Sequence, residues 1–145
     1  MEFDPLKLEN QLCFPLYAFA KEIVKLYKPF LDEINLTYTQ YITMMVLWEH
    51  TTLTVKELGK HLYLDSGTLT PLLKKLEKEG LVSRLRSAED EREVNVALTD
   101  KGTLLRKKAE LIPAKMSSCI NLPSGDLLKL HEIIHNMLQQ IESKN

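Results

Sequence analysis

The order of the sequence patterns between residues 54 and 98 most restricts the fold of this chain. Thr54 and Glu57 have the spacing of a capping box, which predicts the start of a short helix. Leucines at positions 69, 72, 73 and 76 predict a second helix, because this spacing puts them on one buried face. Gly80 ends that helix. Alternating apolar residues then predict two strands at 81–86 and 94–98, joined by a charged loop.

The second helix carries a different chemistry on the side opposite its leucines. Asp65 or Ser66 caps its start. The residues on the opposite side are small or hydroxylic near the start and basic toward the end: Gly67, Thr70, Pro71, Lys74 and Lys78. A short helix, a helix with such a polar start and a charged hairpin form the pattern of a winged helix-turn-helix. DNA suits this arrangement, because hydroxyls can read base edges and lysines can neutralise phosphates. Winged helices also serve as protein-binding modules, so the pattern leaves both functions open.

Apolar periodicity in the rest of the chain predicts further helices. They are expected at residues 10–33, from a Thr37–Gln40 capping box to Trp48, from Thr99 to about Ser118 with an interruption at Pro113, and from a cap at Ser124 to the end. The predicted fold class is therefore mainly α with a small two-stranded β wing.

Composition excludes several other classes of protein. With 145 residues, 44% of them hydrophobic, the chain is expected to form one globular domain. The longest apolar stretch without a charge, residues 12–20, is nine residues long, whereas a membrane helix needs about 20. The acidic residues at 1–4 do not resemble a secretory signal, and two cysteines make no disulfide framework. We therefore expect no membrane association and a cytoplasmic location.

The net charge of −1 does not indicate a nucleic-acid binder, so a DNA-binding surface has to be local. One window stands out, from residue 66 to residue 86. It holds five basic side chains against Glu77 and Glu79: Lys74, Lys75, Lys78, Arg84 and Arg86. Many solvated helix faces have the same imbalance, so this window supports DNA binding only together with the fold pattern.

Two sets of motifs resemble a known family. The first set resembles the MarR family of bacterial transcriptional regulators: LDSGTLTPLLKKLE at 64–77, DER at 90–92 and LT at 98–99. The second set narrows the resemblance to the organic hydroperoxide resistance regulators of that family: LENQLCF at 8–14, YKP at 27–29, LTY at 36–38 and LWE at 47–49. The similarity runs from about Lys7 to Pro113 and is weaker beyond.

The resemblance implies a homodimer that binds a pseudo-palindromic DNA operator as a repressor. An organic hydroperoxide then acts as the inducer by oxidising a cysteine. In such proteins the first and last helices form the dimer interface. We accordingly expect a single domain, residues 1–145, with dimerisation helices at 1–36 and 100–145 and a DNA-binding region at 37–99. The apolar faces of residues 10–33 and 124–142 agree with this, because a monomer of this size would struggle to bury both.

The resemblance also implies roles for individual residues. Cys13 would react with the peroxide, Tyr27 and Tyr38 would approach it from the other subunit, and Tyr17 would line the pocket around it. The DNA-binding residues of the recognition helix would be Ser66, Gly67, Thr68, Thr70, Pro71 and Lys74, to which the basic window adds Lys75. The wing would contribute Arg84, Arg86 and Arg92, with Arg92 paired to Asp65 to anchor the wing.

The proposed chemistry is coherent without the family. A thiolate attacks the O–O bond of a peroxide and gives sulfenic acid and an alcohol. Cys13 is near a helix start, which favours negative charge, and phenol hydroxyls can donate to a thiolate. A cysteine in an apolar stretch can equally be a small buried hydrophobic residue. Pro15 departs from the expected pattern and can alter the backbone beside Cys13. Cys119 is either a resolving cysteine, forming an intersubunit disulfide, or a bystander where a small thiol is used.

Two other functions stay open. The first is a MarR-type repressor released by a non-covalent ligand, with Cys13 inert. The second is a zinc peptidase, because the segment from His131 to His135 matches H-E-x-x-H. A catalytic zinc takes a third protein ligand, and the remaining histidines, His50 and His61, lie in the predicted DNA-binding half. We therefore expect no enzyme activity, no metal and no cofactor.

Overall fold

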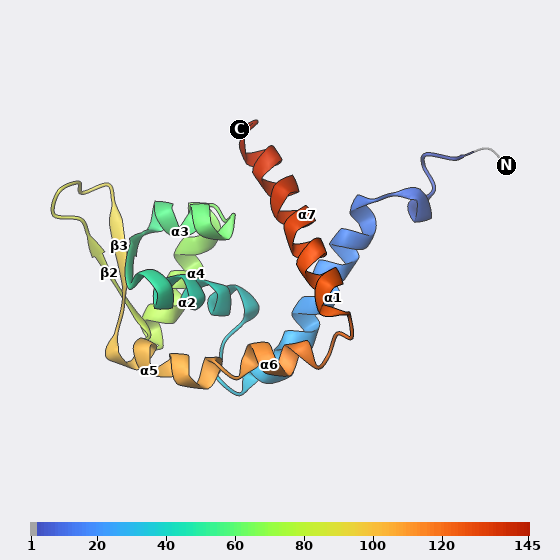
Figure 1. Ribbon diagram of the computed structural model, residues 1–145. Helices are drawn as coiled ribbons and strands as arrows, with labels where there is room; N and C mark the ends of the chain where they lie inside the picture. The colour runs from blue at the N-terminus through green and yellow to red at the C-terminus, as the bar shows by residue number, and fades with distance from the viewer. Residues whose placement is uncertain (1–2) are drawn as a thin grey trace. The chain divides into compact units, whose positions relative to one another are not determined.

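A computed structural model describes residues 3–145 of the protein; Met1 and Glu2, which belong to the acidic N-terminus considered above, lie outside the described residues. The chain forms two compact units, Met1–Pro113 and Ala114–Asn145. The first unit holds the following elements, labelled in Figure 1: η1 (Leu8–Asn10), α1 (Cys13–Asp32), α2 (Tyr38–His50), β1 (Thr52–Thr54), α3 (Val55–Leu62), α4 (Ser66–Lys78), β2 (Val82–Arg86), β3 (Val94–Leu98) and α5 (Asp100–Ala109). Helix α6 (Ile112–Ser117) crosses the boundary, and α7 (Ser124–Glu142) lies in the second unit.

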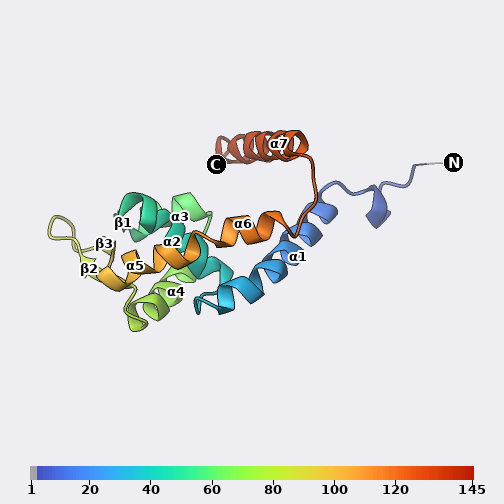
Figure 2. The same cartoon turned by 60° about the horizontal axis from the view of Figure 1, so that its bottom comes forward.

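The first unit has the predicted winged helix-turn-helix architecture. An antiparallel sheet with strand order β1-β3-β2 flanks helices α2, α3, α4 and α5 (Figures 1 and 2). The core lies between these helices and the sheet. Leu69, Leu72, Leu73 and Leu76 of α4 are all buried in it, as their spacing predicts. The fold class predicted from the sequence, mainly helical with a small β wing, is confirmed.

Side chains at the helix starts account for several of the boundaries. Thr37 and Gln40 form a full capping box at α2, with N–O distances of 3.3 and 3.0 Å. Thr54 and Glu57 form a second one at α3, with distances of 3.1 and 2.8 Å. Of the two candidates at α4, Asp65 is the cap, because its carboxylate accepts the Thr68 N–H at 2.7 Å. These predicted caps are therefore confirmed.

The structure differs from the sequence prediction in three local features. The helix predicted from Thr99 to about Ser118 is interrupted between α5 and α6, at residues 110–111, and not at Pro113, which lies inside α6. The wing hairpin of β2 and β3 gains a third strand, β1, which pairs with β3 through Leu53 and Val96. With three residues, β1 is too short for an alternating pattern to be recognised. The predicted cap at Ser124 is wrong. Ser124 is already the first residue of α7, Pro123 precedes it, and none of the described side chains caps this helix.

The turn between α3 and α4 depends on close backbone contact at Gly59. Tyr63, in the left-handed conformation with φ 55°, donates its N–H to the Gly59 carbonyl, and the Leu64 N–H donates to the same oxygen at 3.1 Å. A Cβ atom at residue 59 would lie 2.6 Å from the Leu64 carbonyl oxygen. Only glycine allows the chain to return this closely to α3, so Gly59 sets where α4 begins.

Helix α2 is also fastened to α5. The Trp48 indole N–H donates to the Gly102 carbonyl at 2.9 Å. Gly102 is buried in the first turn of α5, and Thr99 caps that turn by accepting the Gly102 N–H at 3.1 Å. Since α5 follows directly after β3, this hydrogen bond holds the base of the wing to α2.

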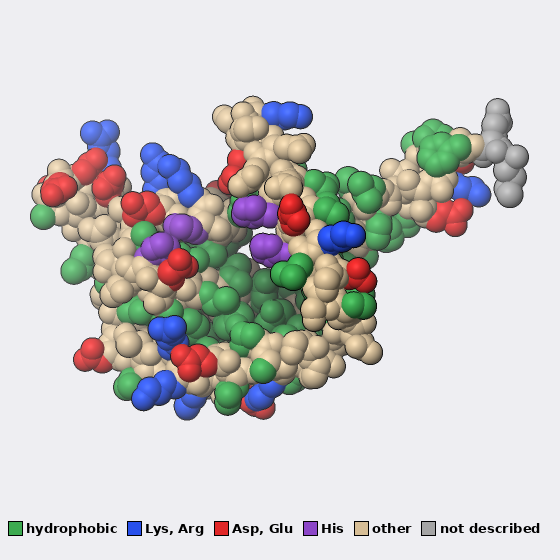
Figure 3. All heavy atoms as spheres, viewed as in Figure 1, with side chains coloured by type: hydrophobic (Ala, Val, Ile, Leu, Met, Phe, Trp, Pro, Cys, Tyr) green, Lys and Arg blue, Asp and Glu red, His purple; other side chains and the backbone are tan. Residues whose placement is uncertain are grey.

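Both terminal helices expose apolar side chains. On α1 these include Phe14, Leu16 and Phe19, and Figure 3 shows hydrophobic side chains gathered at the surface over this helix. On α7, considered by itself, the exposed apolar residues are Leu127, Leu128, Leu130, Ile133, Met137 and Ile141. None of the helices in the described part of the chain is long and apolar enough to cross a membrane.

Candidate nucleic-acid interface and thiol site

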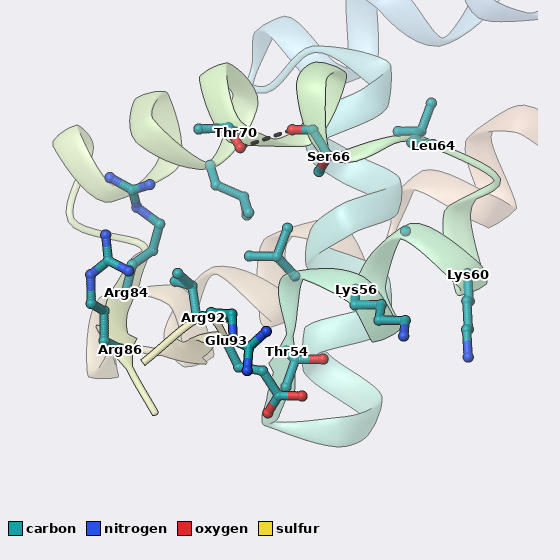
Figure 4. Close-up of a pocket in the computed structure, with 14 residues that line it drawn as sticks. Thr54, Lys56, Lys60, Leu64, Ser66, Thr70, Arg84, Arg86, Arg92 and Glu93 are labelled. Carbon is teal, nitrogen blue, oxygen red and sulfur yellow. Dashed lines mark hydrogen bonds between the residues drawn. The ribbon is translucent and has the colours of Figure 1, made fainter. Parts of the chain in front are cut away.

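A groove with a volume of about 760 Å³ opens between α3, α4 and the wing. Figure 4 shows its labelled residues: Lys56 and Lys60 come from α3, Ser66 and Thr70 from α4, and Arg84, Arg86 and Arg92 from the wing. Five of these seven side chains are cationic, and the groove also holds one carboxylate, that of Glu93, so the groove is positive although the chain as a whole has a net charge of −1. The two lysines of α3 were missed by the sequence analysis. Their i, i+4 spacing on a short helix is the signal that could have identified them.

The predicted recognition-helix residues share the side of α4 opposite its buried leucines. Thr70 is half-buried and the other six are exposed: Ser66, Gly67, Thr68, Pro71, Lys74 and Lys75. The Thr70 hydroxyl donates to the Ser66 carbonyl at 2.8 Å, as Figure 4 shows. In the first turn, the Asp65 carboxylate accepts the Thr68 N–H and also interacts with the Gly67 N–H. The structure therefore groups these residues on one accessible surface.

Asp65 has a role other than the predicted one. Its carboxylate caps α4, and the hydrogen bond from the Thr68 N–H lowers the pKa of this carboxyl below its ordinary value. The predicted Asp65–Arg92 pair is not formed among the described residues. Arg92 instead lies 3.6 Å from Asp90, and its side chain is 93% exposed. The cause is local: the Arg92 backbone N–H also donates to Asp90, at 3.0 Å, so the loop at the wing tip closes on itself.

The three arginines of the wing have different surroundings. The Arg84 guanidinium donates to Glu77 of α4 at 3.1 Å, and its side chain is 22% exposed. The Arg86 guanidinium donates to the Glu91 carbonyl across the hairpin at 2.7 Å. Arg92 at the tip is the most exposed of the three. The sequence analysis missed Glu77, which counted there only as a negative charge within the basic window.

Cys13 is an exposed free thiol and the first residue of α1. Its neighbours Leu12 and Phe14 are also exposed, so its surroundings on the surface are apolar. No side chain of the described residues caps the start of α1. The unpaired N–H groups of this first turn favour a negative charge, although Pro15 removes one of them. The position is therefore accessible to an apolar peroxide.

Tyr27 and Tyr38 form an aromatic cluster with a third residue, Tyr41, that the sequence analysis missed. The ring centroids are 5.0 Å apart for Tyr27 and Tyr38, 5.9 Å for Tyr27 and Tyr41, and 6.4 Å for Tyr38 and Tyr41. Burial raises the pKa of all three phenols above the ordinary value, which keeps them protonated hydrogen-bond donors at neutral pH. Tyr41 has no alternating or motif signal of its own and is recognised only through its packing.

The tyrosine cluster and Cys13 lie at opposite ends of α1. Tyr27 follows Cys13 by fourteen residues in the same helix, a rise of about 21 Å. Tyr27 therefore cannot reach Cys13 within one chain, and the approach of the phenols from another subunit stays a prediction. Tyr17 is one turn from Cys13 and exposed, with the Lys21 ammonium 5.3 Å from its ring centroid.

The remaining candidate residues lie in the second unit. Cys119 is an exposed free thiol just after α6, and its Sγ donates to the Lys115 carbonyl at 3.5 Å. His131 and His135 on α7 have nearly parallel rings, with centroids 6.0 Å apart. Within residues 3–145, no group of three or more histidine, cysteine or acidic side chains could hold a metal ion.

Comparisons with known proteins agree with this geometry. A family model described as transcriptional regulator SarA/Rot matches residues 25–110. The organic hydroperoxide resistance transcriptional regulator of Bacillus subtilis is 51% identical, over 99% of this chain and 98% of that protein. Among solved structures, reduced AbfR bound to DNA is 31% identical with a TM-score of 0.83, covering 99% of this chain and 98% of AbfR. Disulfide-formed AbfR is 33% identical with a TM-score of 0.61, covering 94% and 90%. These relatives are regulators and indicate no catalytic family.

Proposed function

Because this chain belongs to the SarA/Rot family of transcriptional regulators and is similar over almost its whole length to an organic hydroperoxide resistance regulator, we propose that it is a redox-controlled DNA-binding repressor. It binds an operator in the reduced state and releases it when an organic hydroperoxide oxidises Cys13. The observation that carries the proposal is the exposed Cys13 thiol in the first turn of α1, in a chain with this degree of similarity.

The α4 surface and the positive groove support the DNA-binding part of the proposal. The start of α4 carries small and hydroxylic side chains that fit a major groove, followed by Lys74 and Lys75 for phosphates. Arg92 extends from the wing tip toward solvent, where it can reach an adjacent minor groove or the backbone. A relative with 31% identity has been solved on DNA, as its description states.

The exposed apolar faces of α1 and α7 support a homodimer. Each face, taken alone, exposes several large apolar side chains, which a second copy of the chain would cover. A two-fold dimer presents two recognition helices to two half-sites about one helical turn of DNA apart. The operator is therefore proposed to be pseudo-palindromic, and residues 1–36 and 100–145 to hold the dimer together.

The Cys13 thiolate attacks one peroxide oxygen, the O–O bond breaks, and the other oxygen leaves as an alkoxide that takes a proton to become an alcohol. The sulfur is oxidised to sulfenic acid and the peroxide is reduced. Tyr27 and Tyr38 of a second subunit donate hydrogen bonds to the thiolate, with Tyr17 beside the pocket. Two unpaired cysteines in a chain of this kind fit a reducing cytoplasm.

The sulfenic acid then condenses with a thiol, giving a disulfide and one water molecule. Cys119 of a second subunit is the proposed partner, and its exposed position leaves it available. A relative whose description names a disulfide-formed state supports this route. If peroxide-treated protein instead stays monomeric on a non-reducing gel and gains the mass of a small thiol, Cys119 takes no part in the switch.

The test compares operator binding of the wild type and Cys13→Ser, with and without cumene hydroperoxide. Serine keeps the size of cysteine but cannot reduce the peroxide, so Cys13→Ser should fold, bind the operator and stay bound after treatment. Cys119→Ser is the matched control: it should bind the operator normally but form no covalent dimer. Equal release of the wild type and Cys13→Ser would overturn the redox proposal and favour a repressor released by a non-covalent ligand.

A further inference from the structure

One contact between α4 and the wing has a geometry that the proposed DNA contacts do not explain. Both carboxylate oxygens of Glu77 accept hydrogen bonds from Arg84. The guanidinium Nη2 donates to Oε1 at 3.1 Å, and the Arg84 backbone N–H donates to Oε2 at 3.1 Å. Glu77 is in the last turn of α4 and Arg84 is in the middle of β2, so the contact joins the recognition helix directly to the wing.

The position of Glu77 is unfavourable without this partner. The last turn of a helix carries a partial negative charge, which repels a carboxylate. The Arg84 guanidinium offsets this repulsion, and the hydrogen bond from it lowers the pKa of the Glu77 carboxyl below its ordinary value. Arg84 therefore stabilises the charged form of this carboxylate and holds it in place.

The surroundings of Arg84 are those of a structural side chain. Along β2, Val82 is buried, Leu85 is 71% exposed and Arg84 lies on the inner face with Val82. Its Nε is buried and has no hydrogen-bond partner among the described residues. This nitrogen is therefore not available to a phosphate, although the side chain borders the groove. By contrast, the Arg92 side chain is 93% exposed.

We propose that the Glu77–Arg84 pair sets the position of the wing relative to α4, and that Arg84 is a positioning residue instead of a phosphate contact. The proposal rests on the proposed DNA-binding function and changes the role predicted for Arg84. A DNA-binding winged helix has to present α4 and the wing tip to the duplex at a fixed spacing. The turn from Leu76 to Leu81 joins α4 to β2 at one point, and the Glu77 carboxylate supplies a second point of attachment.

The decisive test is the sign of the effect of Glu77→Gln on DNA affinity. The probe is a duplex operator that the wild-type protein selects from a pool of random sequences. Removing a negative charge near DNA should by itself tighten binding. Loss of the positioning contact should instead weaken it, and we expect a loss of about three- to tenfold. Glu79→Gln is the matched control, because it removes the same charge two residues away and should not weaken binding.

The salt dependence of binding tests Arg84 separately. A residue that neutralises one phosphate contributes about one unit to the slope of log affinity against log salt concentration. Arg84→Gln should lower affinity about as much as Glu77→Gln while leaving this slope unchanged, and the double variant should lose little more than either single one. Arg92→Gln should lower the slope by about one unit. A slope that falls by one unit in Arg84→Gln, or wild-type or tighter binding by Glu77→Gln, would overturn the proposal.

Amide hydrogen exchange of the free protein gives a measurement that needs no DNA. The Arg84 amide and the amides of β2 should exchange faster in Glu77→Gln than in the wild type, and unchanged exchange would overturn the proposed attachment. If the wild type selects no operator, the proposed function fails, and the exchange result still decides whether the attachment exists. Should Glu77→Gln not fold, Glu77→Asp keeps the charge, shortens the side chain and is expected to weaken binding in the same way.

Discussion

Substitution of Gly59 by alanine should disturb the placement of α4, because the chain that enters α4 passes directly against this glycine. The Gly59 carbonyl accepts the N–H groups of Tyr63 and Leu64, and the returning chain brings the Leu64 carbonyl oxygen to 2.6 Å from where a Cβ would be. A contact this short is not tolerated, so either α3 or the turn has to move. The nearest side-chain atom, Leu69 Cδ1, would be 3.5 Å away and is an ordinary neighbour.

Two opposing effects decide the magnitude. Alanine in a helix is favoured over glycine by about 1 kcal/mol. Forcing a methyl group against the backbone costs about 1–3 kcal/mol, and weakening one hydrogen bond to the Gly59 carbonyl costs about 1 kcal/mol more. The free energy of unfolding of Gly59→Ala should therefore fall by about 1–3 kcal/mol. Because α4 begins directly after this turn, operator affinity should fall as well.

Urea unfolding at one fixed protein concentration measures the effect, since a dimer's stability depends on concentration. Gly125→Ala is the control. Gly125 is also helical, but a Cβ there would meet none of the described atoms within 4 Å apart from its own helix backbone and chain neighbours, so this variant should gain about 0.5–1 kcal/mol. If Gly59→Ala were as stable as Gly125→Ala, the α3–α4 turn would have yielded without cost and the reasoning from close contact would be refuted.

Three further expectations follow from the same residues. Asp65→Asn keeps a cap but removes the charge. Because the pKa of the Asp65 carboxyl is lowered in the folded chain, the wild type should have the higher free energy of unfolding at pH 7. Urea titrations at decreasing pH should show this difference disappear as the pH falls through that pKa. Lys74→Ala should weaken binding to all DNA sequences and lower the salt slope by about one unit in a titration of affinity against salt. Tyr27→Phe and Tyr38→Phe should each slow the oxidation of Cys13 by cumene hydroperoxide without abolishing it, since each removes one donor to the thiolate; unchanged rates in a stopped-flow assay would exclude their proposed role.

Features that depend on local sequence were predictable. The structure confirms three short-range patterns: the capping boxes at Thr37 and Thr54, the leucine face of α4 and the two hairpin strands. The relationship to the organic hydroperoxide resistance regulators, inferred from motifs at 8–14 and 64–77, is confirmed by 51% identity over almost the whole chain. These signals are local because each helix start and strand is specified by neighbouring residues.

Features that depend on contacts between elements were not predictable. Glu77 meets Arg84 because the helical position of Glu77 and the strand position of Arg84 direct the two side chains toward each other. Neither the helix pattern nor the strand pattern alone shows this contact. Tyr41 joins Tyr27 through packing of α2 against α1. The Arg92–Asp65 pair was expected from the family, whereas Asp90, two residues away, offers Arg92 a partner within its own loop.

Trp48 gives this molecule an optical reporter in a useful place. It is the single tryptophan of the 145 residues, so all indole fluorescence comes from the joint between α2 and α5, where its N–H is bonded to Gly102. Any movement that alters this joint changes the polarity around the ring and with it the emission wavelength. Since α5 follows directly from β3, a shift of the wing base is registered at the same fluorophore. If the proposed operator binding or oxidation moves this joint, the change can be followed in real time, on the unlabelled protein, by light emitted from one known position.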